Sequence, residues 1–334
     1  MKKLAFLLPL LLLLTACGGA QEKHTTQIFA MDTVMDLTVY GDHAQVLQQA
    51  PGLIAELEKN LSVTDPDSEI GILNSKKEAR LSPETAALLS VSLELCEKTD
   101  GALDISVYPV VKAWGFTTGS YRIPSPGERL GLAEHVDYRA IEFSPADATV
   151  RLKDQMEMDL GSVAKGWAGD RLLELFRQQG VTSALLNLGG NVQALGEKPD
   201  GSPFQIGLQD PRGQGYLGVL SIRNEAVITS GGYQRFFEGE DGEIYWHIMD
   251  PATGAPARSG LISATAVGPE GVTCDALSTA LFIMGPEKAL EFWKTHQDFQ
   301  MILVTEDNQV LITEPLADRF VLSQGSSYEL KVIS

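Results

Sequence analysis

Asp275 and Thr279 are the two residues of this sequence whose types and spacing most directly suggest chemistry. They lie four positions apart at the start of a helix-like run, so a helix places the carboxylate and the hydroxyl on one face. Two oxygen ligands one turn apart suit Mg²⁺, which usually takes one or two protein ligands and completes its shell with phosphate and water. The alternative is a helix N-cap and a hydroxyl bonded to its own backbone. The pair predicts phosphate chemistry, although the chain has neither a Walker motif nor a G-x-G-x-x-G motif.

His247 follows a strand-like run upstream of this pair and is itself followed by Asp250 and Pro251. An imidazole that is neutral near pH 7 can accept a proton from an attacking hydroxyl. Asp250 can orient that imidazole, bind metal or cap a turn, and an aspartate before a proline frequently starts a turn. We interpret His247 and Asp250 as candidate catalytic residues.

Two glycine-bearing segments are candidate ligand contacts. Lys165 stands among small residues at the start of an expected helix, where backbone approaches a ligand closely and the helix N-terminus favours anions. It can hold a phosphate, or be a solvated lysine beside a turn. Gly189 and Gly190 follow a predicted strand, where bare backbone admits a flat ligand or a phosphate. A plain turn is the more common explanation of such a pair.

Two further segments combine hydroxyl, carboxyl and aromatic groups. Thr229 and Ser230 precede a second glycine pair, and Tyr233 follows it. These residues can contact phosphate through hydroxyls and amides, or form a turn. Asp104 opens an aromatic-rich run that ends at Phe116. That run can line a ring-binding pocket or belong to the core.

The elements that must position these residues are a mixture of helices and strands without a low-complexity linker or a short repeat. Ser82, Pro83 and Gly101 delimit a helix over 82–99, and apolar spacing ending at Gly180 predicts another over 164–179. Pro286 opens a further helix after Gly285. The predicted strands are 34–40, 183–188, 204–208, 217–222, 226–229, 261–267, 300–305 and 309–313. Short polar turns join many of them, which favours an α+β fold with antiparallel pairing.

The first residues predict export. Lys2 and Lys3 precede an apolar run over 4–14, and Leu-Thr-Ala-Cys17 resembles a bacterial lipobox. We expect a lipoprotein signal peptide over 1–16, a lipidated Cys17 with a polar tether over 17–27, and one domain over 28–334. An ordinary signal peptide that contains a cysteine is the alternative. A lipid at Cys17 would hold the domain at a membrane surface of the bacterial cell envelope, facing the periplasm or the exterior.

The charge balance limits the partners. Without Lys2 and Lys3 the chain has 24 basic against 44 acidic side chains, a net charge near −20. This argues against nucleic-acid binding, and it means that an anionic substrate needs a cation to bridge it. The remaining cysteines, Cys96 and Cys274, can form a disulfide or stay as buried thiols.

Taken in order, these segments resemble the ApbE family of flavin transferases. The resemblance runs from about Met31 to Gly285. Its segments are Met31–Thr33, Ser62–Asn74, Asp104–Phe116, Asp159–Asp170, Asn187–Asn191, Thr229–Tyr233, His247–Pro256 and Asp275–Gly285.

The resemblance implies an α+β architecture related to the T-fold, with largely antiparallel sheets and packed helices. It also implies Mg²⁺ as cofactor and FAD as substrate, with FMN attached through its phosphate to a threonine of a target protein and AMP released. The implied targets are flavoprotein subunits of NADH:quinone reductase or Rnf-type complexes.

By resemblance, Asp275, Thr279 and a backbone carbonyl near Ala164 are the metal ligands, and His247 is the histidine associated with transfer. The expected FAD contacts are Met31, Thr33, Asp104, Lys165, Gly189, Gly190, Thr229, Ser230, Tyr233 and His247. Two alternatives remain open. One is a Mg²⁺-dependent FAD pyrophosphatase that uses water as acceptor, and the other is a non-catalytic exported flavin-binding lipoprotein.

Overall fold

The computed structural model of the chain describes residues 22–334. The expected signal peptide over 1–16 and the lipidation site at Cys17 lie outside the described residues. Within residues 22–334 no helix has the length and apolar character needed to cross a membrane.

A nine-stranded sheet runs through the centre of the fold, in the order β1-β2-β6-β7-β10-β15-β16-β17-β19. Seven of its eight pairings are antiparallel, and only β17 and β19 run parallel. The expected α+β class with largely antiparallel sheets is therefore confirmed. The strands of this sheet are Lys23–Ala30, Thr33–Tyr40, Ala184–Leu188, Asn191–Leu195, Ala226–Gly231, Leu261–Gly268, Gln300–Thr305, Gln309–Thr313 and Glu329–Ile333.

Two layers cover the faces of this sheet, because its strands alternate their side chains. On one face α7 (Gly271–Thr295) packs against β10, β15 and β16 through residues such as Ile228 and Ala266. On the other face a three-stranded sheet, β18-β9-β8, packs against Val227 and Val267. Its strands are Phe204–Gln209 (β8), Tyr216–Ile222 (β9) and Phe320–Leu322 (β18).

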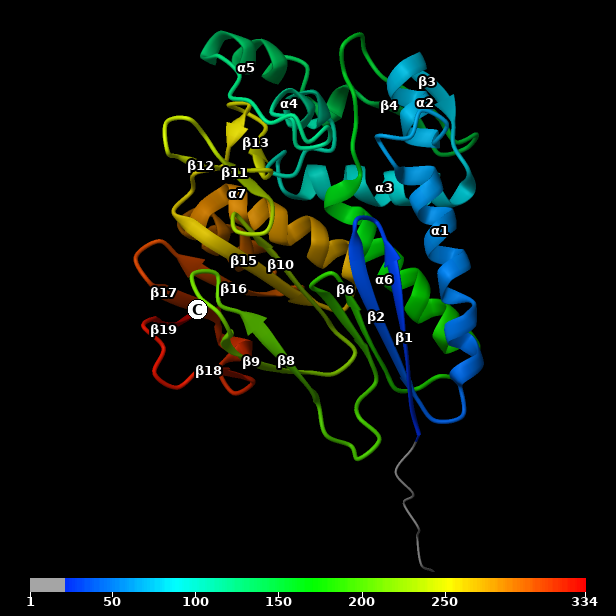
Figure 1. The fold of residues 1–334 in the computed structure, drawn as a ribbon, viewed down its shortest axis with the longest axis vertical. Coiled ribbons are helices and arrows are strands. Elements are labelled where there is room, and N and C mark those ends of the chain that lie inside the picture. The colour runs from blue at the N-terminus through cyan, green and yellow to red at the C-terminus, as the bar shows by residue number, and fades with distance from the viewer. Residues whose placement is uncertain (1–21) are drawn as a thin grey trace, which may run out of the picture.

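The remaining helices lie over the β2–β6 end of the sheet and above it (Figure 1). They are α1 (Ala50–Leu61), α2 (Glu69–Lys76), α3 (Pro83–Lys98), α4 (Tyr108–Ala113), α5 (Pro126–Ala133) and α6 (Gly161–Gln178), with short 3₁₀ turns at Ala44–Gln48, Tyr138–Ala140 and Glu314–Leu316. The small strands are β3 (Glu78–Arg80), β4 (Glu142–Ser144), β5 (Thr149–Arg151), β11 (Phe236–Glu238), β12 (Ile244–Trp246), β13 (Met249–Asp250) and β14 (Ala255–Pro256).

Most predicted elements are confirmed within a few residues, but two boundaries differ, at the start of α7 and at the start of β1. Helix α7 begins at Gly271, so Asp275 lies one turn inside the helix and does not cap it. The helix expected after Gly285 is confirmed, because Gly285, at φ 77° and ψ 172°, separates two helical segments within α7. Strand β1 begins at Lys23 and pairs along its length with β2, so residues 23–27 belong to the sheet and not to a tether.

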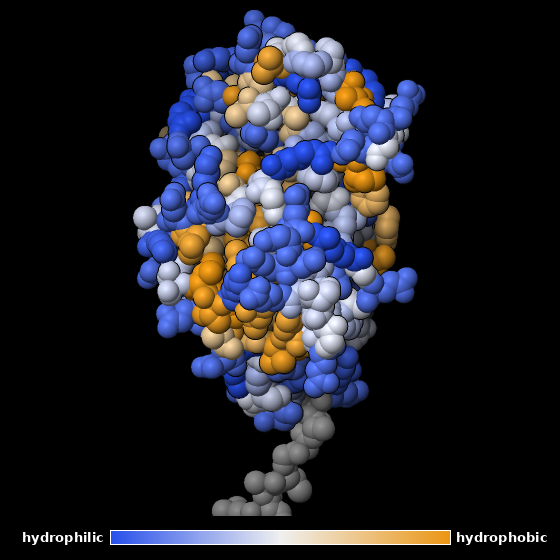
Figure 2. All heavy atoms as spheres, turned by 90° about the vertical axis from the view of Figure 1, so that its left-hand side faces the viewer, coloured by the Kyte–Doolittle hydropathy of each residue, from blue (hydrophilic) through white to orange (hydrophobic). Residues whose placement is uncertain are grey.

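The surface is predominantly polar, with local apolar exceptions. Figure 2 views the side that carries the C-terminal strands and shows hydrophobic side chains gathered in its lower part. Val321 of β18 and Val332 of β19 are among the exposed large apolar residues. Both cysteines of the described chain, Cys96 and Cys274, are buried free thiols, so they form no disulfide with each other.

Candidate functional site

Helices α6 and α7 touch at Gly166, and this contact places Asp275. The backbone amide of Gly166 donates to Asp275 Oδ2 at 2.8 Å, and the side-chain amide Nε2 of Gln193 donates to the Gly166 carbonyl at 2.9 Å. A Cβ on Gly166 would stand 2.3 Å from the Gly271 carbonyl oxygen. Only glycine permits this approach of two backbones. Gly166 is therefore needed for the close packing of α6 against α7.

Asp170 fixes the start of α7 from the same side. Its two carboxylate oxygens accept hydrogen bonds from the Gly271 and Val272 amides, at 2.7 and 2.8 Å. The Asp170 carboxylate therefore caps α7 from α6, in the manner of an N-cap side chain but from another helix. Burial raises the pKa of Asp170 to about 6, against the effect of these two amides.

The carboxyl group of Asp275 is buried, with 5% of the residue exposed. Burial raises its pKa, while Lys165, the Gly166 amide and Asn191 act in the opposite direction. The Asn191 Nδ2 is buried and makes no geometrically good hydrogen bond within residues 22–334. Since burial disfavours the charged carboxylate, a bound cation would relieve this cost.

Hydroxyl groups continue the polar path from Asp275 towards β10. Thr279 Oγ1 lies 3.2 Å from Ser230 Oγ, which lies 2.8 Å from Ser278 Oγ. The Ser278 hydroxyl in turn donates to the Asp275 carbonyl at 2.9 Å. Thr279 therefore shares its hydroxyl with a strand residue and does not bond back to its own helix. The Thr229 hydroxyl lies apart from this path and pairs with Thr265 at 2.7 Å.

The expected metal ligands fit Mg²⁺ by the chemistry of their donor atoms. Asp275 supplies a buried carboxylate, Thr279 supplies a hydroxyl from the same helix face, and Ala164 lies two residues before Gly166. No group of three or more His, Cys, Asp or Glu side chains in residues 22–334 is arranged to hold a metal. A site with a single carboxylate suits Mg²⁺ bound together with substrate phosphate.

His247 follows β12, and its backbone and ring both face Arg235. The His247 amide donates to the Arg235 carbonyl at 3.1 Å, and the imidazole Nδ1 lies 3.2 Å from the same oxygen. A proton on Nδ1 can make this contact, which leaves the lone pair on Nε2. Desolvation lowers the pKa of His247 to about 4, and the Arg235 and Lys165 cations add to this effect. The imidazole is therefore neutral at pH 7.

Asp250 does not support His247. Its Oδ1 accepts a hydrogen bond from the Ala252 amide at 2.9 Å, and its carbonyl accepts from Gly254 at 3.0 Å. Both interactions close the turn between β13 and β14. The expectation that Asp250 aligns the imidazole is wrong for this structure, because the imidazole contacts Arg235 O instead.

Two cations and one further carboxylate surround this histidine. Lys165 and Arg235 each act electrostatically on Asp159 and on His247. Neither cation forms an ion pair with a carboxylate in the described part of the chain. Burial raises the pKa of Asp159, and the Gly161 amide, Arg235 and Lys165 oppose this effect. The group can neutralise a bound polyphosphate.

The turn at Met31, between β1 and β2, touches the turn at Gly189 and Gly190, between β6 and β7. Met31 has a φ of 49° and Gly189 and Gly190 have positive φ values, as two-residue hairpins require. A Cβ on Gly189 would stand 2.1 Å from Thr33 Oγ1. Asn191, directly after the second turn, faces Asp275. The structure thus brings Thr33, Gly189 and Gly190 close to Asp275.

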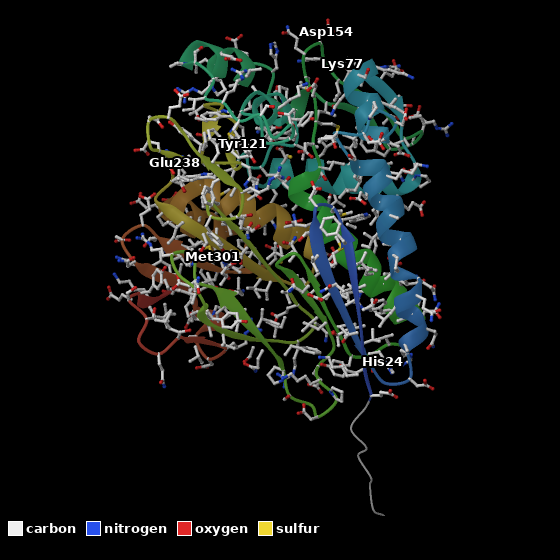
Figure 3. All side chains as sticks on the ribbon, viewed as in Figure 1. His24, Lys77, Tyr121, Asp154, Glu238 and Met301 are labelled. Atoms are coloured by element: carbon white, nitrogen blue, oxygen red, sulfur yellow. The ribbon has the colours of Figure 1, made fainter. Side chains whose placement is uncertain are left out.

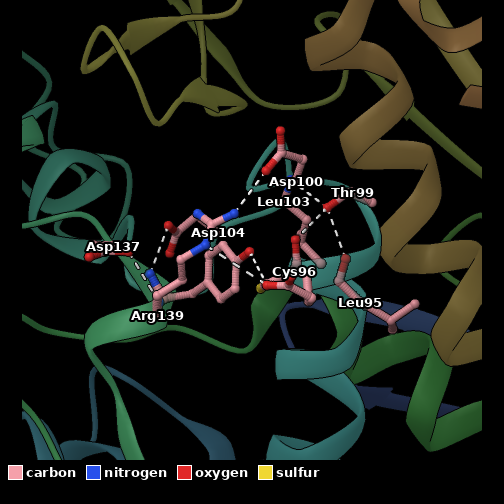
Figure 4. A network of polar contacts seen from close by, with 10 residues as sticks. Leu95, Cys96, Thr99, Asp100, Leu103, Asp104, Asp137 and Arg139 are labelled. Atoms are coloured by element: carbon pink, nitrogen blue, oxygen red, sulfur yellow. Dashed lines mark hydrogen bonds and ion pairs between the residues drawn. The ribbon is translucent and has the colours of Figure 1, made fainter.

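Asp104 and Tyr233 lie in other surroundings. Figure 4 shows Asp104 within a polar network, where its oxygens accept from the Ser106 amide and hydroxyl and from the Tyr138 amide. Oδ1 is therefore used by Ser106 and Oδ2 by the amide of Tyr138 in the 138–140 turn, which argues against a direct contact with a ligand. The Tyr233 ring packs over Gly231, and burial raises the pKa of its phenol to about 12.

A cavity of about 550 Å³ opens beside the Asp159 side of the site. Tyr108, which interacts electrostatically with Asp159, lines it together with Asn74, Thr117 and Glu157. Near the opposite side, aromatic rings gather around the β11–β12 hairpin: Phe116 lies 6.2 Å from the His247 ring, and Tyr121 stacks on Phe237. Figure 3 shows Tyr121 and Glu238 in this region, in the upper half of the view, with His24 near the bottom.

Sequence reasoning missed Arg235, Asn191 as a partner of Asp275, and the capping role of Asp170. Asn191 and Asp170 stood inside segments that it had singled out. Arg235 lies two residues after Tyr233, and its basic charge in so acidic a chain was the one available signal.

Comparison with known proteins gives consistent matches. The model of the ApbE family matches residues 31–303. A protein of Treponema pallidum named FAD:protein FMN transferase is 30% identical over 330 residues, which cover 91% of each chain. A protein of Klebsiella pneumoniae with the same name is 32% identical and covers 85% of this chain and 90% of its own. The crystal structure of an ApbE protein from Thermotoga maritima is 29% identical, with a TM-score of 0.83, over 88% of this chain and 98% of its own.

Proposed function

The chain belongs to the ApbE family, and we propose on this basis that it is a flavin transferase, which cleaves FAD and attaches the FMN half to a protein. The observation that carries the proposal is the neutral His247 imidazole beside two cations, Lys165 and Arg235, which form no ion pair with a carboxylate of the described residues. This arrangement offers a proton acceptor and a place for phosphate charge within one site.

The proposed reaction forms one bond and breaks one. An acceptor hydroxyl attacks the phosphorus of the FMN half, and the P–O bond to AMP breaks, so that AMP leaves with the bridging oxygen. The hydroxyl proton passes to Nε2 of His247, whose Nδ1 faces the Arg235 carbonyl. General-base help of this kind is worth about 10²–10⁴-fold in rate.

The other residues hold the substrate. The ammonium group of Lys165 neutralises charge on the pyrophosphate, and the bare backbone at Gly190, where a Cβ would meet no atom within 4 Å, leaves room for it. Asp275 and Thr279, with a carbonyl near Ala164, would hold Mg²⁺. When bound there, Mg²⁺ would offset charge on the phosphate oxygens and on the departing AMP.

We assign the cavity lined by Tyr108 and Asn74 to a ring system of FAD. Its volume of about 550 Å³ suits a flat aromatic group. The asparagine itself is already bonded to Met158, so it forms a fixed wall of the cavity. An ordered wall favours a rigid ligand, because little side-chain freedom is lost on binding.

The acceptor hydroxyl is proposed to be a threonine of a flavoprotein, as in subunits of NADH:quinone reductase or Rnf-type complexes. Hydrolysis of FAD to FMN and AMP is the second candidate, since water can use the same base and the same cations. The partly exposed His247 favours it as a side reaction, because solvent reaches the imidazole when no acceptor covers it.

The site is proposed to face away from a membrane. Strand β1 begins at Lys23, at the end of the sheet opposite the β1–β2 turn that borders the site (Figure 1). A lipid on Cys17 would hold that lower end at the surface of the cell envelope. Eight residues of strand, about 26 Å, would then separate the surface from the turn.

The test uses the purified protein with FAD, Mg²⁺ and a threonine-bearing fragment of a candidate acceptor. Intact-mass spectrometry of the acceptor is expected to show an added FMN, with equimolar AMP, and EDTA is expected to abolish both. AMP without an adduct, across several acceptors, would support the hydrolase instead. An acceptor with threonine replaced by valine is the matched control and should stay unmodified.

A further inference from the structure

Arg235 connects three parts of the site through one residue. Its carbonyl oxygen accepts the His247 amide at 3.1 Å and lies 3.2 Å from the imidazole Nδ1. Its guanidinium Nη2 donates to the Phe116 carbonyl, in the aromatic segment on the other side. The backbone of Arg235 therefore positions His247, and the side chain of Arg235 extends to the Phe116 carbonyl.

Among residues 22–334 the Arg235 guanidinium has no carboxylate partner. The chain has 44 acidic against 26 basic residues, and the described arginines Arg122, Arg139 and Arg258 form ion pairs with Glu128, Asp100 and Glu243. No ion pair of Arg235 exists within residues 22–334. Its side chain is nevertheless close enough to act on both Asp159 and His247.

A purely structural role explains only part of this arrangement. One N–H of the guanidinium is bonded to the Phe116 carbonyl, and a neutral amide side chain could supply that bond equally well. The remaining donors of the planar fork stay available, and such a fork matches phosphate oxygens in a bidentate way. A positive charge that stands beside a histidine without a counter-ion becomes favourable when an anion binds between them.

The position of Arg235 selects one of the two phosphates. The phosphorus under attack must lie within reach of the imidazole that takes the acceptor proton. The Arg235 carbonyl contacts the His247 amide and the imidazole Nδ1, and its guanidinium is bonded to the carbonyl of Phe116, whose ring lies 6.2 Å from the imidazole. Lys165, which acts on Asp275 more directly than Arg235 does, lies on the metal side of the site. Arg235 and Lys165 therefore lie at different ends of the bound pyrophosphate.

We propose that the Arg235 guanidinium binds the non-bridging oxygens of the FMN phosphate and stabilises the charge on this phosphate while the acceptor oxygen attacks it. The inference rests on the proposed function. Arg235 gains and loses no proton in the step. The acceptor proton goes to His247, the new O–P bond replaces the P–O bond to AMP, and the guanidinium stays charged throughout.

The experiment compares Arg235→Gln and Arg235→Lys with Arg258→Gln. Arg258 is a matched control, because it lies beside the same hairpin, pairs with Glu243 and stacks over Trp246 at 5.0 Å. Single-turnover transfer from FAD is expected to slow by about 10²–10³-fold in Arg235→Gln, the usual loss for one donor to a developing charge. Arg235→Lys should recover part of the rate, and Arg258→Gln should stay near the wild type.

Two readouts separate this role from a structural one. Removing the cation raises the pKa of His247, so the acid limb of the pH–rate profile should move to higher pH in Arg235→Gln. The groups that face the imidazole are Lys165 and Arg235, with Asp159 interacting with both cations. A slower rate with an unmoved acid limb would assign Arg235 to folding or positioning alone and overturn the proposal.

Binding of FMN and of riboflavin, measured by flavin fluorescence, tests the phosphate contact without any turnover. Arg235→Gln is expected to weaken FMN about tenfold, the loss of one charge-assisted contact, and to leave riboflavin unchanged. If Arg235→Gln weakens the binding of FMN and riboflavin equally, or weakens the binding of neither, the contact is refuted. If the wild type transfers no FMN and releases no AMP, the proposed function fails, while this binding comparison still decides whether Arg235 holds the phosphate.

Discussion

Replacing Gly166 with alanine tests the requirement that α6 and α7 touch for the site to form. The alanine Cβ would stand 2.3 Å from the Gly271 carbonyl oxygen and 2.8 Å from Asp275 Cβ. The Gly271 oxygen belongs to backbone, so no side-chain rotation can relieve the first contact. The two helices must separate by about 1 Å to restore an ordinary van der Waals distance.

The cost follows from this displacement. Overpacking of this kind typically costs about 1–3 kcal/mol. Two hydrogen bonds are also strained, from the Gly166 amide to Asp275 and from Gln193 to the Gly166 carbonyl, each worth about 1 kcal/mol. The better helix propensity of alanine returns about 1 kcal/mol. We expect the free energy of unfolding to fall by about 2–4 kcal/mol.

Urea unfolding of the purified protein, followed by circular dichroism, measures this change. Gly52→Ala is the matched control, because Gly52 also lies in a helix, α1, and a Cβ there meets no atom within 4 Å. This control should be neutral or stabilising by up to about 1 kcal/mol. Mg²⁺-dependent turnover should fall in Gly166→Ala and stay unchanged in Gly52→Ala.

A Gly166→Ala protein as stable as Gly52→Ala would refute the reasoning about the helix contact. Full stability with lost turnover would mean that the helices yield easily but Asp275 moves. Lost stability with full turnover would mean that the contact supports the fold and not the site.

Four further predictions follow from the site. His247→Ala should slow transfer by about 10²–10⁴-fold while FAD binding stays largely intact, and an equal loss of FAD affinity in titration would make His247 a binding residue instead. Asp275→Ala should lose the Mg²⁺ dependence of turnover, and an unchanged magnesium titration would remove this residue from the metal site. Folding raises the pKa of Asp170 from 3.8 to about 6, so the folded state binds the carboxyl proton more tightly than the unfolded state does. The bound proton therefore stabilises the fold fully below pH 3.8, and this stabilisation is lost as the pH rises through about 6. Urea titrations at several pH values should therefore show that the free energy of unfolding of the wild type falls by about 3 kcal/mol relative to that of Asp170→Asn over this range. If the free energies of the two proteins change with pH in parallel, the raised pKa of Asp170 is contradicted. Cys17→Ser should move the full-length protein from the membrane fraction to the soluble fraction of lysed cells, and unchanged partitioning would exclude the lipid at this cysteine.

The sequence by itself determined the elements whose signals are local. Ser82 and Pro83 mark the start of α3, and the break at Gly285 was visible because glycine precedes proline there. Such signals depend on backbone conformations that a few neighbouring residues impose. The strands β16 and β17 were predicted with their observed bounds for the same reason, since apolar residues flank a polar turn.

The sequence also indicated the pair Asp275 and Thr279, but not what surrounds it. Their spacing depends only on the helical repeat. The start of α7 at Gly271 was missed because its cap is Asp170, a hundred residues away on α6. Local patterns cannot report a cap that comes from another helix.

Tertiary structure alone decided the identity of the partners in the site. Asp250 stood near His247 in sequence, yet it closes its own turn, and the imidazole faces the Arg235 carbonyl instead. Asp104 was a reasonable ligand by type, but folding committed both of its oxygens to Ser106 and Tyr138. Residue type and spacing fix what a side chain can do, whereas desolvation and hydrogen-bond competition in the folded chain fix what remains free to act.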